Sequence, residues 1–88
     1  MSKGVAIATW TFGQAAVAAS GDVLSGGGSA MDAVEAGIRV AELDASEHSV
    51  GYGGLPNEEG VVQVDAAVMD GATLDVGSVA ALEGVRAP

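Results

Sequence analysis

The chain has no cysteine, which excludes disulfide bonds, thiolate catalysis and zinc held by thiolates. Aromatic side chains are also scarce: they make up 3% of the 88 residues, and most of the 49% hydrophobic fraction is alanine and valine. Small side chains bury little area each, and a chain of this length buries only about 60–65% of the surface that its unfolded form exposes. We therefore expect at most one domain with a thin, marginal core.

Basic residues are few and scattered. Lys3, Arg39 and Arg86 stand against twelve acidic residues, which gives a net charge of -9. A surface that binds phosphates needs clustered Lys or Arg, so the composition excludes nucleic-acid binding and disfavours an anionic membrane surface. No apolar run is long enough for a signal-peptide core or a membrane span, and we expect a cytoplasmic protein.

The first third of the chain predicts one strand and one helix. The continuous apolar run Gly4–Thr9 is typical of a buried strand. The Ala-rich run Phe12–Leu24 predicts a helix, which the glycines of Ser25–Gly28 should end.

A second helix is predicted from Ser29 to about Leu43. Ser29 and Asp32 have the spacing of a capping box, in which each side chain bonds to a free backbone amide of the first turn. Apolar residues repeat at helical spacing on one face (Met31, Val34, Ile38, Ala41), and polar residues on the other (Asp32, Glu35, Arg39, Glu42). Glu35 and Arg39 are spaced for an ion pair.

The last third of the chain predicts a β-hairpin. Val61–Gly71 has the composition of a strand, Asp70-Gly71 is a strong hairpin turn, and Thr73–Leu82 forms the second strand, which we expect either to end or to continue into a helix. The order strand, helix, helix, loop, hairpin predicts an α+β fold.

The loop HSVGYGGLPNEEG, His48 to Gly60, is the main candidate for chemistry. His48 is the only histidine and has Glu47 beside it, but without a second histidine a metal site would lack its usual ligands. Ser49 lacks the glycine two residues before it that a nucleophile elbow requires. Residue chemistry alone therefore favours structural roles for both residues, and also for Asp65, Asp70 and Asp75.

Two further features have a structural and a functional interpretation. The triple glycine before the second helix is not followed by the Lys-Ser/Thr pair of a P-loop, so a helix connection is favoured over phosphate binding. Trp10 and Phe12 follow the first predicted strand, where they would either pack in the core or line the mouth of a pocket.

Five blocks of this chain, in this order, resemble the glycosylasparaginase family. The blocks are ATWTFGQAA, GGSAMDAVEAGIRVAE, HSVGYGGLPNEEG, VDAAVMDGATLDVGSVAAL and GVRAP. The resemblance extends from about Ile7 to Pro88, and over this range the chain is similar to the N-terminal part of these enzymes. They belong to the asparaginase and isoaspartyl-peptidase group of N-terminal-nucleophile amidohydrolases.

The resemblance implies a four-layer αββα fold made of two chains that arise by self-cleavage of one precursor. It also implies a threonine nucleophile whose own α-amine is the base, so that no histidine is needed. The expected substrate is N-acetylglucosaminyl-asparagine or a simpler β-aspartyl amide, without metal or organic cofactor. The expected partners are the C-terminal (β) segment and other αβ units in an oligomer.

The resemblance carries site residues over to this chain. Trp10 matches a tryptophan that lines the substrate site, and Phe12 an aromatic of the same neighbourhood. Ser49 matches a serine that lies beside the nucleophile and helps to hold its amino group. The glycines of the loop should let it pass close to the reactive centre (Gly51, Gly53, Gly54).

The chain also departs from the family pattern. Thr11 replaces the usual proline between Trp10 and Phe12, and the family's cysteines are absent, as in its bacterial members. The threonines lie outside the Asp-Thr or Gly-Thr context that the family cleaves (Thr9, Thr11, Thr73).

We therefore expect residues 1–88 to be an incomplete N-terminal segment that is inactive alone, because GVRAP stops where family members continue into another helix. Two alternatives remain open. The complete protein could act as an isoaspartyl peptidase or L-asparaginase, or the chain could be a non-catalytic remnant that serves as an interaction module.

Overall fold

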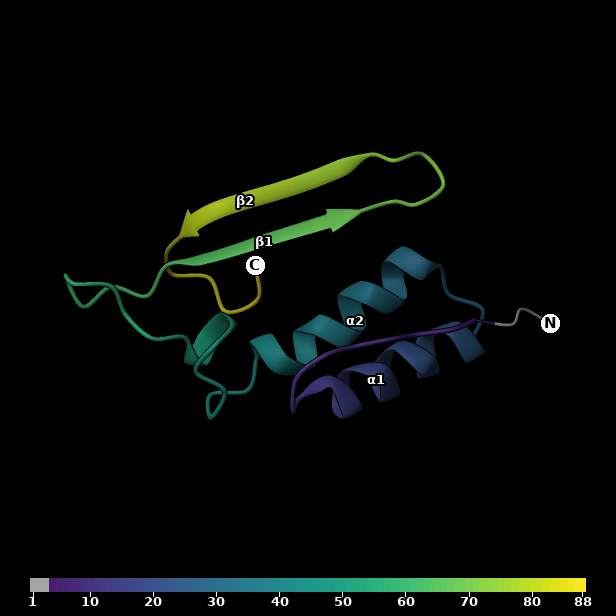
Figure 1. Ribbon diagram of the computed structural model, residues 1–88, viewed down its shortest axis with the longest axis horizontal. Helices are drawn as coiled ribbons and strands as arrows, with labels where there is room; N and C mark the ends of the chain where they lie inside the picture. The colour runs from purple at the N-terminus through teal and green to yellow at the C-terminus, as the bar shows by residue number, and fades with distance from the viewer. Residues whose placement is uncertain (1–3) are drawn as a thin grey trace. The chain divides into compact units, whose positions relative to one another are not determined.

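The computed structural model describes residues 4–88 and contains two α-helices, one 3-10 helix and two β-strands, which confirms the α+β class. The chain divides into two compact units at the end of the second helix, between Ala41 and Glu42. Each unit is described by itself. Figure 1 shows the elements in chain order.

Helix α1 spans Gly13–Ser25 and helix α2 spans Ala30–Glu42. The glycines after Ser25 end α1 as predicted: the Gly26 amide bonds to the Asp22 carbonyl, and Gly27 has a φ of 85°, which favours glycine. The Ser29 hydroxyl accepts the Asp32 amide at 3.1 Å, which confirms the serine half of the capping box. Arg39 and Glu35 form the predicted ion pair at 3.7 Å.

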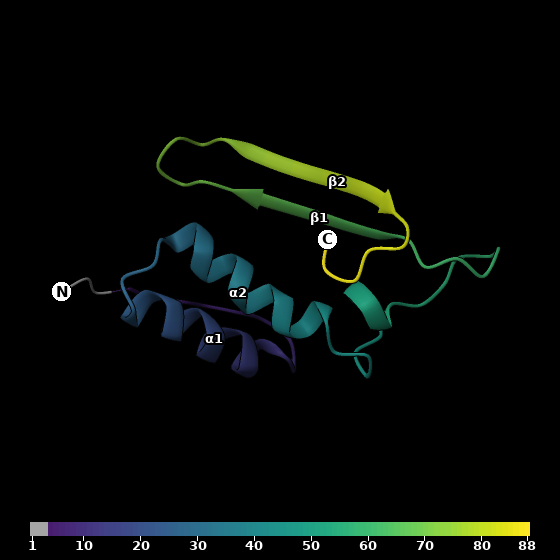
Figure 2. The same cartoon turned by 180° about the vertical axis from the view of Figure 1, so that it is seen from behind.

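The two helices pack through small residues. Ser20 of α1 is buried, and its hydroxyl donates to the Ala33 carbonyl of α2 at 2.6 Å. A Cβ on Gly37 would lie 2.9 Å from the Ala16 carbonyl oxygen, so only glycine permits this approach. The helices run side by side in both ribbon views (Figures 1 and 2).

This close contact makes the predicted apolar face of α2 only partly right. Ala41 is buried as predicted, but Val34 and Ile38 are exposed. The buried residues are instead Ala33, Gly37 and Ala41, because their small size lets the helix backbones approach. Glu42, predicted on the polar face, is also buried.

The predicted buried strand Gly4–Thr9 is wrong. These residues form no strand, and Val5 and Ile7 are each 93% exposed. Within the first unit the segment runs beside α1 and α2 (Figures 1 and 2), and this unit contains no strand with which its backbone could pair. Together with both helices it lines a cavity of about 410 Å³.

Strands β1 (Val64–Met69) and β2 (Val76–Leu82) form the predicted antiparallel hairpin, and β2 does not continue into a helix. The turn begins at Asp70-Gly71 as predicted but is longer, since the Asp70 amide bonds to the Asp75 carbonyl at 2.9 Å. A register shift between Val64 and Ala66 marks a bulge. Of the hairpin residues, only Val64 is buried.

The core is as thin as the composition predicts. Among residues 4–88 the buried apolar residues are Ala16, Ala33, Ala41 and Val64. Within the same range, no helix has the length and hydropathy that crossing a membrane requires.

Candidate functional site

Trp10 lies at the turn that leads into α1, with its carbonyl accepting the Gly13 amide at 3.1 Å. The side chain is 79% exposed, so core packing within the first unit is wrong as an interpretation. Its φ of 68° is rare for a residue other than glycine and costs of order 1–3 kcal/mol. Leu74 (φ 63°) and Ala81 (φ 53°) adopt the same backbone region, so the angle by itself does not assign a function to Trp10.

Phe12 occupies the N-cap position of α1, where its carbonyl accepts the Ala16 amide at 3.1 Å. Its half-buried side chain contributes to the 410 Å³ cavity of the first unit, whereas Trp10 does not. The two aromatic residues predicted for one neighbourhood therefore share a turn but not their surroundings.

Ser49 lies in the second unit, in the loop before the 3-10 helix η1 (Gly51–Gly53). It is exposed, and its hydroxyl donates to Glu47 Oε1 at 2.6 Å. The Ser49 amide donates to the same oxygen at 3.2 Å. The Ser49 hydroxyl thus donates its proton in a hydrogen bond to Glu47, while the lone pairs of the hydroxyl oxygen remain as acceptors.

His48 does not activate Ser49. Its Nδ1 lies 2.8 Å from the Gly53 carbonyl oxygen, and because a carbonyl can only accept, Nδ1 carries the proton in this bond. Ser49 donates to a carboxylate and not to an imidazole, so the pair does not form the serine–histidine arrangement of a nucleophile and its base. This hydrogen bond gives His48 the structural role that was predicted for it from the absence of a second histidine.

The loop glycines provide clearance for the chain's own backbone. Gly51 is buried with a φ of 56°, and a Cβ there would lie 2.5 Å from the Glu42 Cα. A Cβ on Gly53 would lie 2.6 Å from the Ala45 carbonyl oxygen. The Gly54 amide bonds to the Gly51 carbonyl at 3.0 Å. Their predicted clearance for a reactive centre stays a prediction.

The acidic side chains near the loop are bonded locally. Hydrogen bonds from the hydroxyl (2.6 Å) and amide (2.9 Å) of Ser46 lower the pKa of Asp44 below its ordinary value. Residues 4–88 contain no group of three or more His, Cys, Asp or Glu side chains placed to hold a metal ion.

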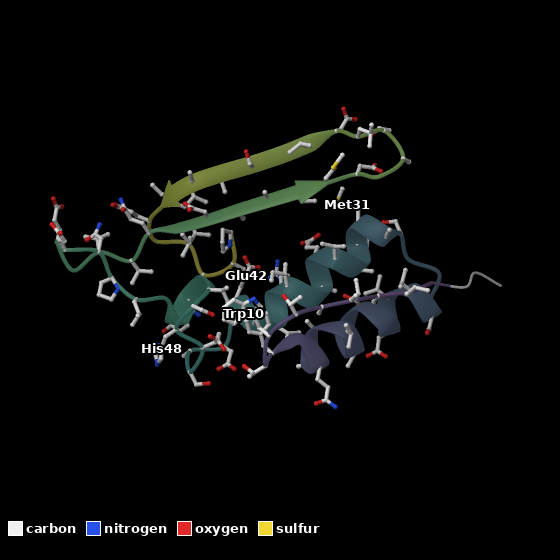
Figure 3. The ribbon with its side chains drawn as sticks, in the orientation of Figure 1. Trp10, Met31, Glu42 and His48 are labelled. Carbon is white, nitrogen blue, oxygen red and sulfur yellow. The ribbon has the colours of Figure 1, made fainter. Side chains whose placement is uncertain are left out.

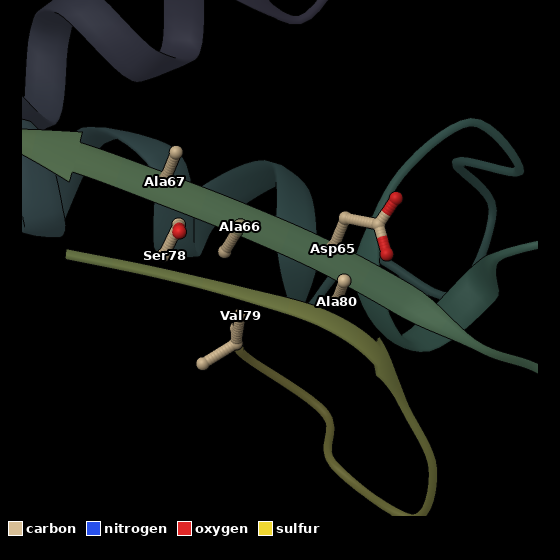
Figure 4. Close-up of a pocket in the computed structure, with 6 residues that line it drawn as sticks. All are labelled: Asp65, Ala66, Ala67, Ser78, Val79 and Ala80. Carbon is tan, nitrogen blue, oxygen red and sulfur yellow. The ribbon is translucent and has the colours of Figure 1, made fainter.

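The hairpin carries an open hollow of about 580 Å³ (Figure 4). Small side chains of both strands line it, together with Asp65. The Asp65 carboxylate accepts the Ala81 amide at 2.8 Å, beside the bulge, and Asp70 likewise accepts the Ala72 amide at 2.9 Å. Both carboxylates therefore have the structural roles that were predicted for them.

The structure thus places the predicted site residues in two groups. Trp10 and Phe12 belong to the first unit, and Ser49 with the loop glycines belongs to the second; Trp10 and His48 are labelled in Figure 3. Sequence reasoning missed Glu47 as the partner of Ser49. The spacing could have indicated it, because Asp44 and Ser46 repeat the same two-residue pattern of acid and serine.

Comparison with known proteins gives a consistent result. A family model described as asparaginase matches residues 2–88. The N(4)-(beta-N-acetylglucosaminyl)-L-asparaginase of Elizabethkingia miricola is 46% identical over 87 residues, which are 99% of this chain and 25% of the relative. The mouse protein of the same name is 46% identical over 78 residues, 89% of this chain and 22% of the relative.

Another relative carries a different name. The probable isoaspartyl peptidase/L-asparaginase 3 of Arabidopsis thaliana is 41% identical over 87 residues, 94% of this chain and 24% of the relative. The chain therefore spans about a quarter of the length of the curated relatives it matches.

Proposed function

Because this chain belongs to the asparaginase family, we propose that it is the N-terminal part of an amidohydrolase that cleaves the β-amide of N4-(β-N-acetylglucosaminyl)-L-asparagine. The observation that carries the proposal is the 46% identity over 87 residues with a relative of that name. In the complete enzyme, the helix pair and the hairpin would contribute to a four-layer αββα fold.

The proposed nucleophile is a threonine outside residues 1–88, freed by self-cleavage of a precursor. Its hydroxyl adds to the amide carbon while its α-amine takes the proton. The glycosylamine leaves with a proton, and water then hydrolyses the resulting ester to aspartate. The threonines of this chain follow Ala or Trp and lie outside the Asp-Thr or Gly-Thr context that the family cleaves, so none of them is proposed to be freed as this nucleophile (Thr9, Thr11, Thr73).

Ser49 is proposed to hold the α-amine of the nucleophile. Its proton already bonds to Glu47, so the Ser49 oxygen can accept an N–H from that amine. Glu47 is then a positioning residue for the hydroxyl. Trp10 is proposed to line the substrate pocket, which the exposure of its side chain supports.

A second candidate is isoaspartyl peptidase or L-asparaginase activity. The identity of 41% over 87 residues with the Arabidopsis relative favours it almost as strongly. The comparison that separates the two is the kcat/KM of the complete protein for the sugar-linked substrate and for an isoaspartyl dipeptide.

The test uses a chimeric protein, hereafter the joined protein, in which residues 1–88 replace the matching N-terminal part of the Elizabethkingia relative. We expect it to release aspartate from N-acetylglucosaminyl-asparagine. Ser49→Ala should lower kcat by about 10- to 100-fold, the effect of losing a hydrogen bond to a charged group. Ser46→Ala is the matched control and should stay near wild type, since Ser46 has the same local bond to an acid but no proposed role.

A folded joined protein that releases aspartate from neither substrate would contradict the proposal. If Ser49→Ala and Ser46→Ala lowered kcat equally, the proposed amidohydrolase function would stand and only the proposed role of Ser49 would be refuted.

A further inference from the structure

The segment after β2 contacts the loop of Ser49 through one side chain. The guanidinium carbon of Arg86 lies 4.9 Å from the centroid of the Tyr52 ring, within the range of a cation–π contact. Tyr52 is the middle residue of η1 and is half exposed. Because Arg86 and Tyr52 lie 34 positions apart, the contact ties together two parts of the second unit that the sequence separates.

The glycines of η1 contact the preceding part of the chain. Gly51 is buried against the backbone of Glu42, and the Gly53 carbonyl accepts a hydrogen bond from His48. These contacts leave no room for a side chain on Gly51 or Gly53. The position of η1 therefore depends on contacts of its backbone with residues 42–48 and of the Tyr52 ring with Arg86.

Ser49 lies between two of these fixed points. His48 directly precedes it and is bonded to Gly53, and Gly51 follows it after one residue. The Ser49 hydroxyl is exposed and has a single local bond, to Glu47, which is itself in the same loop. A shift of η1 would therefore move Ser49 and Glu47 together.

We propose that Arg86 is a positioning residue: its guanidinium holds the Tyr52 ring, and through η1 it keeps the Ser49 hydroxyl in the orientation that the reaction requires. Arg86 does not touch the substrate in this account. The inference rests on the proposed function, because it assigns Arg86 to the site that contains Ser49.

The contact itself can be measured in the 88-residue chain without any activity. Arg39 and Arg86 are its only arginines, so the chain gives two Nε–H signals in a proton–nitrogen NMR spectrum. A proton above an aromatic face is shifted upfield by the ring current. We expect one upfield-shifted Nε–H signal, which Arg86→Lys removes and which returns to its ordinary position in Tyr52→Leu. Two unshifted Nε–H signals in a wild-type chain whose dispersed amide signals show that it is folded would overturn the proposal.

The positioning role is measured in the joined protein. Arg86→Met should lower kcat by about two- to fivefold, the range of an exposed cation–π contact, with KM unchanged, because Ser49 is assigned to the nucleophile and not to substrate binding. Arg86→Lys keeps the cation and should recover at least half of the lost kcat. Arg39→Met removes the same charge from α2 and should leave kcat unchanged.

The outcomes are distinguishable. A joined wild-type protein without activity overturns the proposed function and the role of Arg86 with it, while the NMR spectrum still decides whether the contact exists. An active joined protein in which Arg86→Met behaves like wild type, or in which Arg86→Lys is as impaired as Arg86→Met, overturns the positioning role alone.

Discussion

Different interactions hold together the two helices of the helix pair and the two strands of the hairpin. In the helix pair, small residues of α1 and α2 interlock and the buried Ser20 hydroxyl bonds across the contact. In the hairpin, the backbone ladder pairs β1 with β2, but the valines of β2 stay exposed, with Val76 at 64% and Val79 at 42%. Side-chain substitutions should therefore change stability mainly in the helix pair, and backbone pairing should dominate in the hairpin.

The largest expected effect is at Gly37. Gly37→Ala places a Cβ against the Ser20 hydroxyl and the Ala16 carbonyl, so the helices must separate, and we expect the free energy of unfolding to fall by about 1–3 kcal/mol. Gly21→Ala is the matched control in α1, where nothing lies within 4 Å of the added Cβ. It should raise the free energy of unfolding by up to about 1 kcal/mol, through helix propensity alone.

Urea unfolding followed by circular dichroism at 222 nm measures both variants. If Gly37→Ala stabilised the chain as much as Gly21→Ala, the helices would not be in contact at Gly37, and the contrast with the hairpin would fail.

Removing a serine hydroxyl should change the free energy of unfolding less than Gly37→Ala does. Ser20→Ala removes the 2.6 Å bond to the Ala33 carbonyl and should lower the free energy of unfolding by about 1 kcal/mol. Ser78→Ala makes the same change in exposed β2 and should stay within about 0.5 kcal/mol of wild type. The same urea titrations compare them, and a cost at Ser78 as large as at Ser20 would mean that side chains of the hairpin contribute more than its exposure indicates.

The smallest effect concerns pH and belongs to the loop before η1. The two bonds from Ser46 lower the pKa of Asp44, so their contribution to stability is present above the ordinary value of 3.8 and is lost as the pH falls through the lowered pKa. Ser46→Ala removes the largest cause and should move the carboxyl titration of Asp44, followed by carbon-13 NMR, to higher pH. An unchanged titration would show that these bonds are absent in solution.

The elements that the sequence predicts well are those with local causes. The Ser29 cap and the glycines after Ser25 set the helix ends, and Asp70-Gly71 sets the hairpin, because each acts within a few residues. Gly4–Thr9 was predicted wrongly because a strand needs a neighbouring strand, and apolar composition does not provide one. The buried face of α2 was partly wrong because the contact with α1 selects residues by small size and not by hydrophobicity.

The candidate site shows the same division between local and distant causes. The bond between Glu47 and Ser49 follows from their spacing, which the sequence contains. The contact of Arg86 with Tyr52 depends on how the chain after β2 returns to the loop, and no local pattern indicates it. The strain at Trp10 is likewise invisible in residue types, since only the backbone angles show it.

The central claim is that residues 1–88 supply part of an amidohydrolase site whose nucleophile lies elsewhere. Its most direct test measures aspartate released from N-acetylglucosaminyl-asparagine by the 88-residue chain alone and by the joined protein, at equal concentration. We predict release by the joined protein and none by the chain alone. Turnover by the chain alone would contradict the claim, and so would a folded joined protein without turnover.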